Sequence, residues 1–252
     1  MSAFPLSAYV QLCLSSPGRF SSVAWRRWGL LFRNPFNPSC HDANHAVILD
    51  DSCDLPEALE EIERHYARRL IAPRIHTGFV SGEEERLLPF LKSHGWSVEY
   101  AEAKIFLQTG RCPPPPFGFA FERPKELTSE VAALLLAEGG EWSLGMAEYL
   151  LRHPECAAFA ARAEDGTLAS FLYILRGYGC AVIQGVVTLP EYRRRGLGFG
   201  LLCAAIAEFR KNWPNTPLFL EAESKEAIRL YEEAGFAPID APRRWSAFKC
   251  LA

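Results

Sequence analysis

The chain has 252 residues, of which 49% are hydrophobic and 23% are charged, and its formal net charge at pH 7 is -3. This length supplies a sizeable core and fits one large domain or two modest ones. The slight acidity makes nucleic acids and anionic membranes poor partners, and no run of residues approaches the roughly 20 apolar residues of a membrane span. Because the first twenty residues also lack the pattern of a secretory leader, we expect a cytoplasmic protein.

The N-terminal part offers no convincing metal site. The 8 cysteines are scattered without a Cys-x-x-Cys pair, which is typical of reduced, apolar side chains. The loop at residues 34–45 contains His41 and His45, but this spacing provides a ligand pair mainly on a helix, and Pro35 and Pro38 favour irregular backbone. We therefore expect no metal, and a hydrogen-bonded loop that lines an interface or an acceptor pocket.

A helix and a faint repeat follow. Residues 55–70 predict a packed helix with a solvated, glutamate-rich face. Residues 87–98 align with residues 227–238 at a constant offset of 140 positions, and Gly95-Trp96 then takes the place of Gly235-Phe236. One interpretation is an internal repeat whose N-terminal copy is incomplete. The other is that any amphipathic helix that ends in glycine and an aromatic residue aligns equally well.

Four consecutive prolines at residues 113–116 divide the chain. They can neither continue a helix nor pair inside a sheet, and they favour a stiff, extended connector. The same prolines would also suit an arm packed on the surface. We predict an N-terminal domain at residues 1–111, a proline-rich linker at residues 112–118 and a second domain at residues 119–252.

The second domain shows alternating strand and helix patterns. In chain order we expect a helix at residues 127–137, a flexible break at residues 138–142 and a second helical stretch that runs to residue 152. A hairpin of strands 156–162 and 168–175 follows, then a strand at 181–188, a helix at 199–210, a strand at 218–223, a helix at 225–234 and a final strand through residue 248. This order predicts an α/β fold with an α+β type of sheet, that is, one mixed sheet whose two faces are both covered by helices.

The most informative segment is the turn RRRGLG at residues 193–198, between a predicted strand and a predicted helix. Such a turn aims several backbone N–H groups and the positive end of a helix dipole at one place, which suits a pyrophosphate. Gly196 and Gly198 leave room for a ligand and permit unusual backbone angles. Three arginines are also typical of a solvated turn or a weak nucleic-acid patch, but the chain has no broad basic stripe to support duplex binding.

Two motifs resemble signatures of the GNAT superfamily of N-acetyltransferases. Residues 186–198, VVTLPEYRRRGLG, resemble the acetyl-CoA signature, whose core is Arg or Gln, two residues, Gly, one residue, and Gly or Ala. Residues 224–236, SKEAIRLYEEAGF, resemble the second signature, in which Leu-Tyr is followed by Gly-Phe. The resemblance covers about residues 119–252 and implies the GNAT acyl-CoA N-acyltransferase fold. Taken together with the repeat, the resemblance offers the interpretation that the chain is a tandem of two GNAT-like units, of which the first is degenerate.

The resemblance implies that acetyl-CoA binds along the strand and the turn. The backbone of Val186, Val187 and Thr188 would pair with the pantetheine arm as an added strand does. The turn would offer its N–H groups to the pyrophosphate, and its arginine side chains would add charge-assisted bonds. The turn residues are Arg193, Arg194, Arg195, Gly196, Leu197 and Gly198. Where the family often has Asn, this chain has Ser224, which can cap the helix or contact CoA.

By the same resemblance, Tyr231 is the candidate acid that protonates the departing CoA thiolate. The alternative is a core aromatic residue whose hydroxyl finds a backbone partner. The general base is harder to place, because the strand at residues 181–188 contains no acid. Glu221 and Glu223 on the next strand are candidates, although either would also suit a surface. Gly185 is expected to mark a bulge where the strands separate.

The acceptor side is expected near Glu141 and Trp142, in the loop that the fold uses for specificity, and Glu141 is a third candidate base. We predict an acetyl-CoA-dependent N-acetyltransferase that acts on a primary amine, small-molecule or peptide, by direct attack in a ternary complex. The acceptor, the acyl length and the oligomeric state stay open. A non-catalytic CoA-binding sensor or assembly module is the alternative. A nucleic-acid-binding role for residues 193–195 is weaker and would require steep salt dependence.

Overall fold

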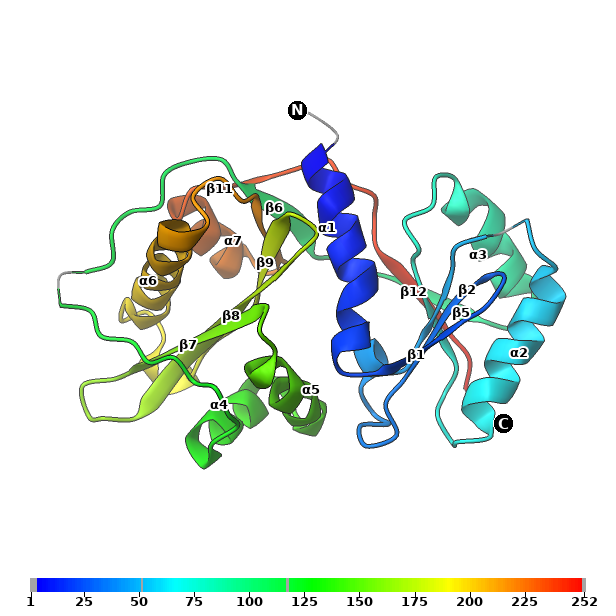
Figure 1. The fold of residues 1–252 in the computed structure, drawn as a ribbon, viewed down its shortest axis with the longest axis horizontal. Coiled ribbons are helices and arrows are strands. Elements are labelled where there is room, and N and C mark those ends of the chain that lie inside the picture. Colours follow the sequence, from blue (N-terminus) through cyan, green and yellow to red (C-terminus); the bar gives the residue numbers. More distant parts are fainter. Residues whose placement is uncertain (1–3, 51, 117, 251–252) are drawn as a thin grey trace. The chain divides into compact units, whose positions relative to one another are not determined.

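The computed structural model describes residues 4–50, 52–116 and 118–250. The chain forms two compact units, which are shown in Figure 1. Unit 1 comprises Met1–Cys13 and Ala103–Ala241, and unit 2 comprises Leu14–Glu102 and Pro242–Ala252. Each unit is therefore assembled from two separate stretches of the chain.

The sheet of unit 1 has six strands in the order β11-β6-β10-β9-β8-β7. The strands are β6 (Lys104–Gln108), β7 (Cys156–Arg162), β8 (Leu168–Gly177), β9 (Cys180–Thr188), β10 (Leu218–Ala222) and β11 (Phe236–Pro238). The pair β9–β10 is parallel and the other neighbours are antiparallel. The predicted α/β fold with a mixed sheet is therefore confirmed.

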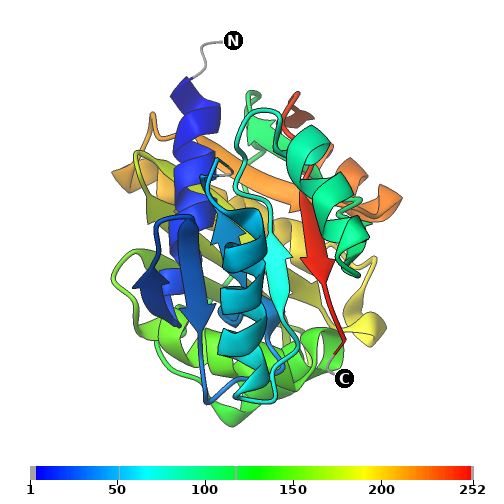
Figure 2. The ribbon, with the colours of Figure 1, turned by 90° about the vertical axis from the view of Figure 1, so that its right-hand side faces the viewer.

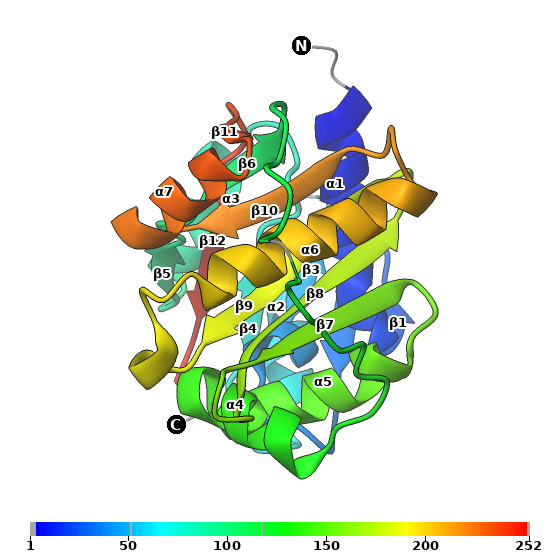
Figure 3. The same cartoon turned by 90° about the vertical axis from the view of Figure 1, so that its left-hand side faces the viewer.

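Helices pack on both faces of this sheet. The helices of unit 1 are α4 (Ser129–Gly139), α5 (Glu141–Arg152), α6 (Leu197–Asn212), α7 (Lys225–Glu233) and most of α1 (Phe4–Ser15), with a short 3₁₀ turn, η3 (Pro190–Tyr192). Figure 3 shows α6 lying over the strands of this sheet. One buried cluster joins α6 and α7 to the face of β8 that carries Leu172 and Ile174. On the opposite face, the ring of Tyr9 from α1 packs against Phe219 of β10.

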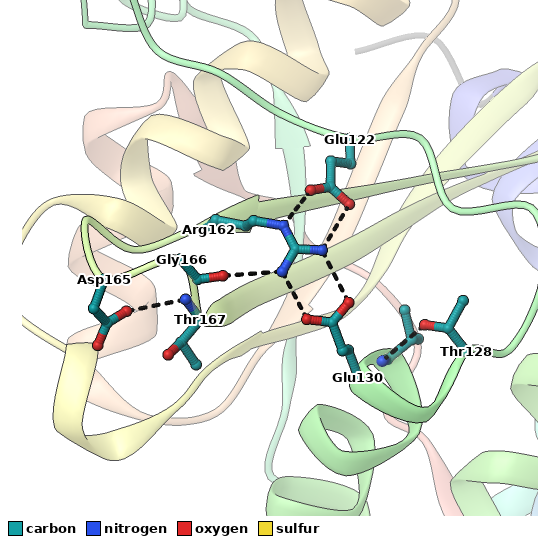
Figure 4. A network of polar contacts seen from close by, with 8 residues as sticks. Glu122, Thr128, Glu130, Arg162, Asp165, Gly166 and Thr167 are labelled. Carbon is teal, nitrogen blue, oxygen red and sulfur yellow. Dashed lines mark hydrogen bonds and ion pairs between the residues drawn. The ribbon is translucent and has the colours of Figure 1, made fainter.

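A polar network on the surface of unit 1 holds its edge strand in place (Figure 4). Arg162 of β7 forms ion pairs with Glu122 at 2.5 Å and with Glu130 at 2.7 Å. Thr128 caps α4 by accepting a hydrogen bond from the N–H of Val131, as its position before the helix predicts. The segment after the prolines is thereby tied to both the sheet and α4.

The sheet of unit 2 also has six strands, in the order β1-β2-β3-β4-β12-β5. They are β1 (Ser22–Trp25), β2 (Gly29–Arg33), β3 (Ala46–Ile48), β4 (Arg74–His76), β5 (Ser97–Tyr100) and β12 (Trp245–Phe248). Figure 2 shows α2 (Leu55–Ala67) and α3 (Glu83–Ser93) on one side of this sheet. They share a buried cluster that includes Ile62, Leu91 and Trp96. The buried carboxylate of Glu83 accepts hydrogen bonds from the N–H of Gly78 and from the indole of Trp245.

The two sheets have the same strand order, and each contains one parallel pair, β9–β10 in unit 1 and β3–β4 in unit 2. One strand is exchanged between them. In unit 1, β6 pairs with both β10 and β11, whereas in unit 2 the corresponding place between β4 and β5 is filled by β12. The sequence repeat falls on equivalent elements, since α3 leads into β5 and α7 leads into β11. This duplicated topology agrees with the tandem interpretation.

The exchange moves the unit boundaries away from the prolines. Residues 103–111, which we placed in the N-terminal domain, belong to unit 1 because β6 pairs in its sheet. Residues 242–252, which we placed in the second domain, belong to unit 2 because β12 pairs there. Local patterns identify a strand but say nothing about which sheet it joins.

The loop at residues 34–45 is hydrogen-bonded, as expected. The N–H of Asn34 donates to Oδ1 of Asn44 at 2.9 Å, and Nδ2 of Asn44 donates to the carbonyls of Asn37 and Cys40. Within the described ranges, no group of three or more His, Cys, Asp or Glu side chains could hold a metal ion. None of the helices in the described part of the chain has both the length and the apolarity needed to cross a membrane.

His45 and His76 form a stacked pair in unit 2, with ring centroids 4.1 Å apart. Burial, followed by the charges of Arg244, Arg74 and His41, lowers the pKa of His76 to about 3. Burial and then the neighbouring His76 hold the pKa of His45 well below its usual range. Since unfolded histidine titrates near pH 6.5, the unfolded chain binds more protons than the folded chain between about pH 3 and 6.5.

We expect the free energy of unfolding to decrease as the pH falls through this window. The slope is at most about 1.4 kcal/mol per pH unit for each histidine. Urea denaturation at pH 7.5, 6.5 and 5.5 measures it. His76→Phe should reduce the slope, because the replacement cannot be protonated in the unfolded chain. An equal pH dependence in the wild-type protein and this variant would contradict the assignment.

Candidate functional site

The turn between β9 and α6 has the backbone shape that the sequence predicts for an anion cradle. Arg194 and Gly196 both adopt left-handed conformations, with φ of 60° and 79°. Gly196 is the N-cap residue of α6 and caps it without a side-chain hydrogen bond. The space beside Gly196 is open, since an added Cβ would meet no atom within 4 Å. Residues 193–196 are all exposed.

The backbone N–H groups of residues 194–199 are available to a ligand. On one side of this run, the N–H of Arg193 donates to the carbonyl of Pro190 at 3.2 Å. On the other side, the N–H of Gly200 donates to the carbonyl of Gly196 at 2.8 Å. Between them, no N–H of residues 194–199 donates to another residue that the structure describes. The first turn of a helix has no internal partner for such groups, and they lie at the positive end of the α6 dipole.

The three arginines of the turn differ in their contacts. Nε of Arg193 donates to the carbonyl of Thr188 at 2.9 Å, so this side chain ties the turn to the end of β9. The guanidinium of Arg195 lies 5.6 Å from the centroid of the Tyr192 ring. Arg193 was expected to contact the ligand, and the hydrogen bond to Thr188 gives its side chain a structural contact as well. Arg194 and Arg195 are the exposed cations nearest the free N–H groups.

Gly198 lets α6 begin directly against the end of β9. A Cβ at this position would lie 2.6 Å from Oγ1 of Thr188. That hydroxyl is 2.9 Å from Oγ of Ser170, which itself donates to the carbonyl of Val187. The hydroxyl network and the glycine together bring the cradle next to the strand end.

The parallel strands β9 and β10 separate at the same end of the sheet. Their pairing runs from Ala181 opposite Leu218 to Ile183 opposite Leu220 and stops there. Strand β9 continues to Thr188. Beyond Ile183, the edge of β9 that faces away from β8 has no strand partner among the described residues. An extended ligand can pair with that edge as an added strand does.

The expected bulge at Gly185 is confirmed. The register of β8 against β9 shifts between Phe171, which is opposite Val187, and Tyr173, which is opposite Gln184. Strand β9 therefore carries one extra residue over this interval. Gly185 takes a left-handed conformation with φ of 61°. The bulge lies next to the last paired residue, Ile183, so it marks the point where β9 leaves β10.

Tyr231 lies on α7 and is 6% exposed, within the cluster that also holds α6 and β10 side chains. Burial raises the pKa of its phenol to about 12. In the described part of the chain no group accepts a hydrogen bond from this hydroxyl. The phenol therefore stays protonated at neutral pH.

The candidate carboxylates lie in different environments. Glu221 is half-buried, one residue beyond the last β9–β10 pair, and accepts a hydrogen bond of 2.5 Å from the hydroxyl of Tyr9. Glu223 is exposed between β10 and α7. Ser224 is the N-cap of α7 and accepts a bond from the N–H of Ala227, as its sequence position predicts. Glu223 thus lies just after β10 and not within it, and of the two carboxylates Glu221 is the one beside the separation of the strands.

Glu141 and Trp142, which we expected in a flexible loop, instead form the start of α5, and Trp142 is 39% exposed. They lie on a different element from the turn and from the strands β9 and β10. The structure thus brings the turn, Val186–Thr188 and Glu221 around one end of the sheet, with Tyr231 on the adjoining helix. It leaves the expected acceptor residues on a separate helix.

Sequence reasoning missed two side chains near the bulge. Tyr9 comes from α1, a helix that we did not predict. Tyr173 places its ring against Gly185, where an added Cβ would lie 2.7 Å from Cε1 of the ring, and its hydroxyl donates to Oε1 of Gln184 at 3.1 Å. The alternation of β8 residues was the available signal, because Tyr173 and Phe171 share the face opposite Leu172 and Ile174.

Comparisons with known proteins agree with this geometry. Residues 126–236 match the family model described as the acetyltransferase (GNAT) family. No curated protein matches the chain. A GCN5-related N-acetyltransferase from Kribbella flavida is similar in structure with a TM-score of 0.68 and 20% identity, over 99% of this chain and 96% of that chain.

Two further solved structures share the fold. A functionally unknown conserved protein from Staphylococcus epidermidis has a TM-score of 0.62 and 13% identity, over 91% of this chain and 94% of that chain. A tandem GNAT protein from the clavulanic acid biosynthesis pathway has a TM-score of 0.53 and 15% identity, over 81% of this chain and 75% of that chain. At these identities the likeness concerns the fold, and it extends over both units.

Proposed function

We propose that this chain, which carries a GNAT acetyltransferase domain at residues 126–236, transfers the acetyl group of acetyl-CoA to a primary amine. The observation that supports this proposal most is the run of unused N–H groups at residues 194–199, beside an unpaired strand edge. One feature suits a pyrophosphate and the other suits the amide-containing arm attached to it.

The turn and the unpaired edge of β9 give the donor a continuous path. With the pyrophosphate on the turn, the pantetheine arm would run along β9 from Thr188 toward Gln184. Four strand steps cover about 13 Å at about 3.3 Å per residue. The thioester would then lie where β9 and β10 separate, between Gly185 and Glu221. The arm would hydrogen-bond mainly to the main chain of Val186, Val187 and Thr188, which leaves their side chains to pack.

The residues around that point supply the proton transfers of direct acyl transfer. An ammonium acceptor must lose a proton before its nitrogen attacks the thioester carbon. Glu221 is the base that we propose, acting directly or through a water molecule, with Tyr9 orienting its carboxylate. Glu223 and Glu141 are less suited because both are exposed. Glu141 and Trp142 remain our proposed acceptor contacts.

When the tetrahedral intermediate collapses, the bond from carbon to sulfur breaks and the thiolate takes up a proton. We propose Tyr231 as its donor. The raised pKa of this phenol keeps the proton in place at the working pH. As the amide forms, its nitrogen gives up a second proton, which returns to the Tyr231 phenolate directly or through water. The amide product and the free thiol then leave, and Glu221 releases its proton to solvent.

Among the residues that the structure describes, unit 2 shows no equivalent cradle. The turn before α2 is the counterpart of the turn before α6, and two of its described N–H groups donate to carboxylates. Asp54 accepts a hydrogen bond from the N–H of Glu57, and Asp50 accepts one from the N–H of Ser52. A pyrophosphate would meet negative charge there. We therefore expect one CoA per chain.

Calorimetric titration with CoA and acetyl-CoA tests the donor site, and release of CoA thiol over a panel of amines tests the transfer. We expect one binding site per chain and turnover with at least one amine. An absence of CoA binding would overturn the proposal. Tight binding without turnover on any amine would instead favour a non-catalytic sensor or assembly module.

A further inference from the structure

We infer that Tyr173 limits the length of the acyl group that this domain transfers, so that acetyl is preferred over longer chains. The inference rests on the proposed function, because it places the thioester where β9 and β10 separate. It adds a specificity-determining residue that lies outside the CoA-binding signature.

The acyl group cannot extend within the plane of the sheet. Directly beyond the separation, Ile183 of β9 is paired with Leu220 of β10. The two strands are in register from there to Ala181 and Leu218. An acyl chain of more than a few carbons must therefore turn toward one face of the sheet.

One face is filled by the core. Ile183, Leu220 and Tyr231 belong to a single buried cluster with side chains of α6 and α7. Each of these three side chains is buried. Protein cores are close-packed, and inserted methylenes force neighbouring side chains out of their rotamers. This face can accommodate a longer chain only by disrupting the core that holds Tyr231.

Tyr173 closes the other face at the same level. It is 7% exposed, its ring lies against the backbone of Gly185, and its hydroxyl is held by the side-chain amide of Gln184. Contact with the bulge on one side and a hydrogen bond at the far end restrict the rotation of the ring. The ring is therefore a steric barrier with a defined position.

The register of β8 singles out Tyr173 among the side chains of that strand. Phe171 is opposite Val187, a position alongside the pantetheine arm. Leu175 is opposite Val182, where β9 and β10 are already paired. Only Tyr173, opposite Gln184, is level with the point of separation among the β8 residues on this face. Removing its ring should open space where the acyl chain needs it.

The test compares acetyl-CoA with hexanoyl-CoA, using an amine that the panel identifies. The readout is the ratio of the two kcat/KM values within each protein, which does not depend on the fraction of folded enzyme. We expect the wild-type protein to favour acetyl-CoA by at least about ten-fold. Tyr173→Ala should shift this ratio toward hexanoyl-CoA by about ten-fold or more. Calorimetry with both thioesters should show the same trend in binding.

Two variants distinguish the removal of the Tyr173 steric barrier from a general loss of packing. Tyr173→Phe retains the ring and should keep the preference for acetyl. Ile174→Ala removes the next side chain of β8, which is buried on the opposite face, and should also leave the ratio unchanged. If Tyr173→Ala does not fold, Tyr173→Leu provides a smaller opening and should give a smaller shift in the same direction.

The inference is overturned if the wild-type protein uses both donors equally, or if a folded Tyr173→Ala retains the wild-type ratio. Either result would leave the proposed acyl transfer intact. A protein that binds neither thioester would overturn the proposed function and this inference with it.

Discussion

Gly198→Val should weaken CoA binding by at least about 100-fold, which corresponds to about 2.7 kcal/mol, while the protein remains folded. A Cβ at position 198 would lie 2.6 Å from Oγ1 of Thr188. Thr188 would have to rotate and lose its contact with Ser170, or the first turn of α6 would have to move away from β9. Either response displaces the N–H groups that the pyrophosphate needs. Calorimetry with CoA measures the loss.

The matched control for this prediction is Ala207→Val, which adds a similar branched side chain to the exposed side of the same helix. It should bind CoA as the wild-type protein does. Thermal denaturation followed by circular dichroism shows whether each variant is folded, since overpacking costs about 1–3 kcal/mol. If folded Gly198→Val retained wild-type affinity, the pyrophosphate would have to bind elsewhere.

The sequence predicts the parts of this site that depend on neighbouring residues. The strand, the glycine turn and the helix are consecutive, so apolar periodicity and glycine positions indicate them directly. Gly185 marks the bulge for the same reason, because a bulge is a local departure from strand geometry. Ser224 likewise precedes the helix that it caps.

The parts that the sequence could not predict depend on distant pairing. Nothing in residues 104–108 or 245–248 indicates which sheet each strand joins, so the exchange of β6 and β12 could not be predicted. The domain boundaries were therefore predicted at the prolines. Helix α1 has no charged residue and little apolar periodicity, and the contact of Tyr9 with Glu221 was missed with it. Contacts such as that of Tyr173 with Gly185 require the register of two strands, which no local pattern contains.

Tyr231→Phe should lower kcat by about 100-fold or more, the usual contribution of a positioned acid, and should leave the Kd for CoA within about three-fold. The substitution removes a hydroxyl and retains the ring that packs 6.3 Å from Phe236. Because burial raises the pKa of the phenol to about 12, Tyr231 loses its proton only as the pH rises toward that value. The ratio of wild-type to variant kcat should therefore be constant between pH 7 and 10. Steady-state rates over that range, combined with calorimetry, provide the measurement.

The opposing interpretation assigns Tyr231 to the core alone, and the two interpretations differ in what the hydroxyl does. A purely structural hydroxyl affects stability by about 1 kcal/mol and does not affect the chemical step. Tyr66→Phe is the matched control for this pattern, because Tyr66 is a buried tyrosine of unit 2 whose hydroxyl donates to the carbonyl of Phe32 at 2.7 Å. We expect Tyr66→Phe to lose stability and retain kcat, and Tyr231→Phe to do the reverse. Equal kcat values in both variants would leave the thiolate to take its proton from solvent, and Tyr231 would then serve only to pack α7 against the sheet.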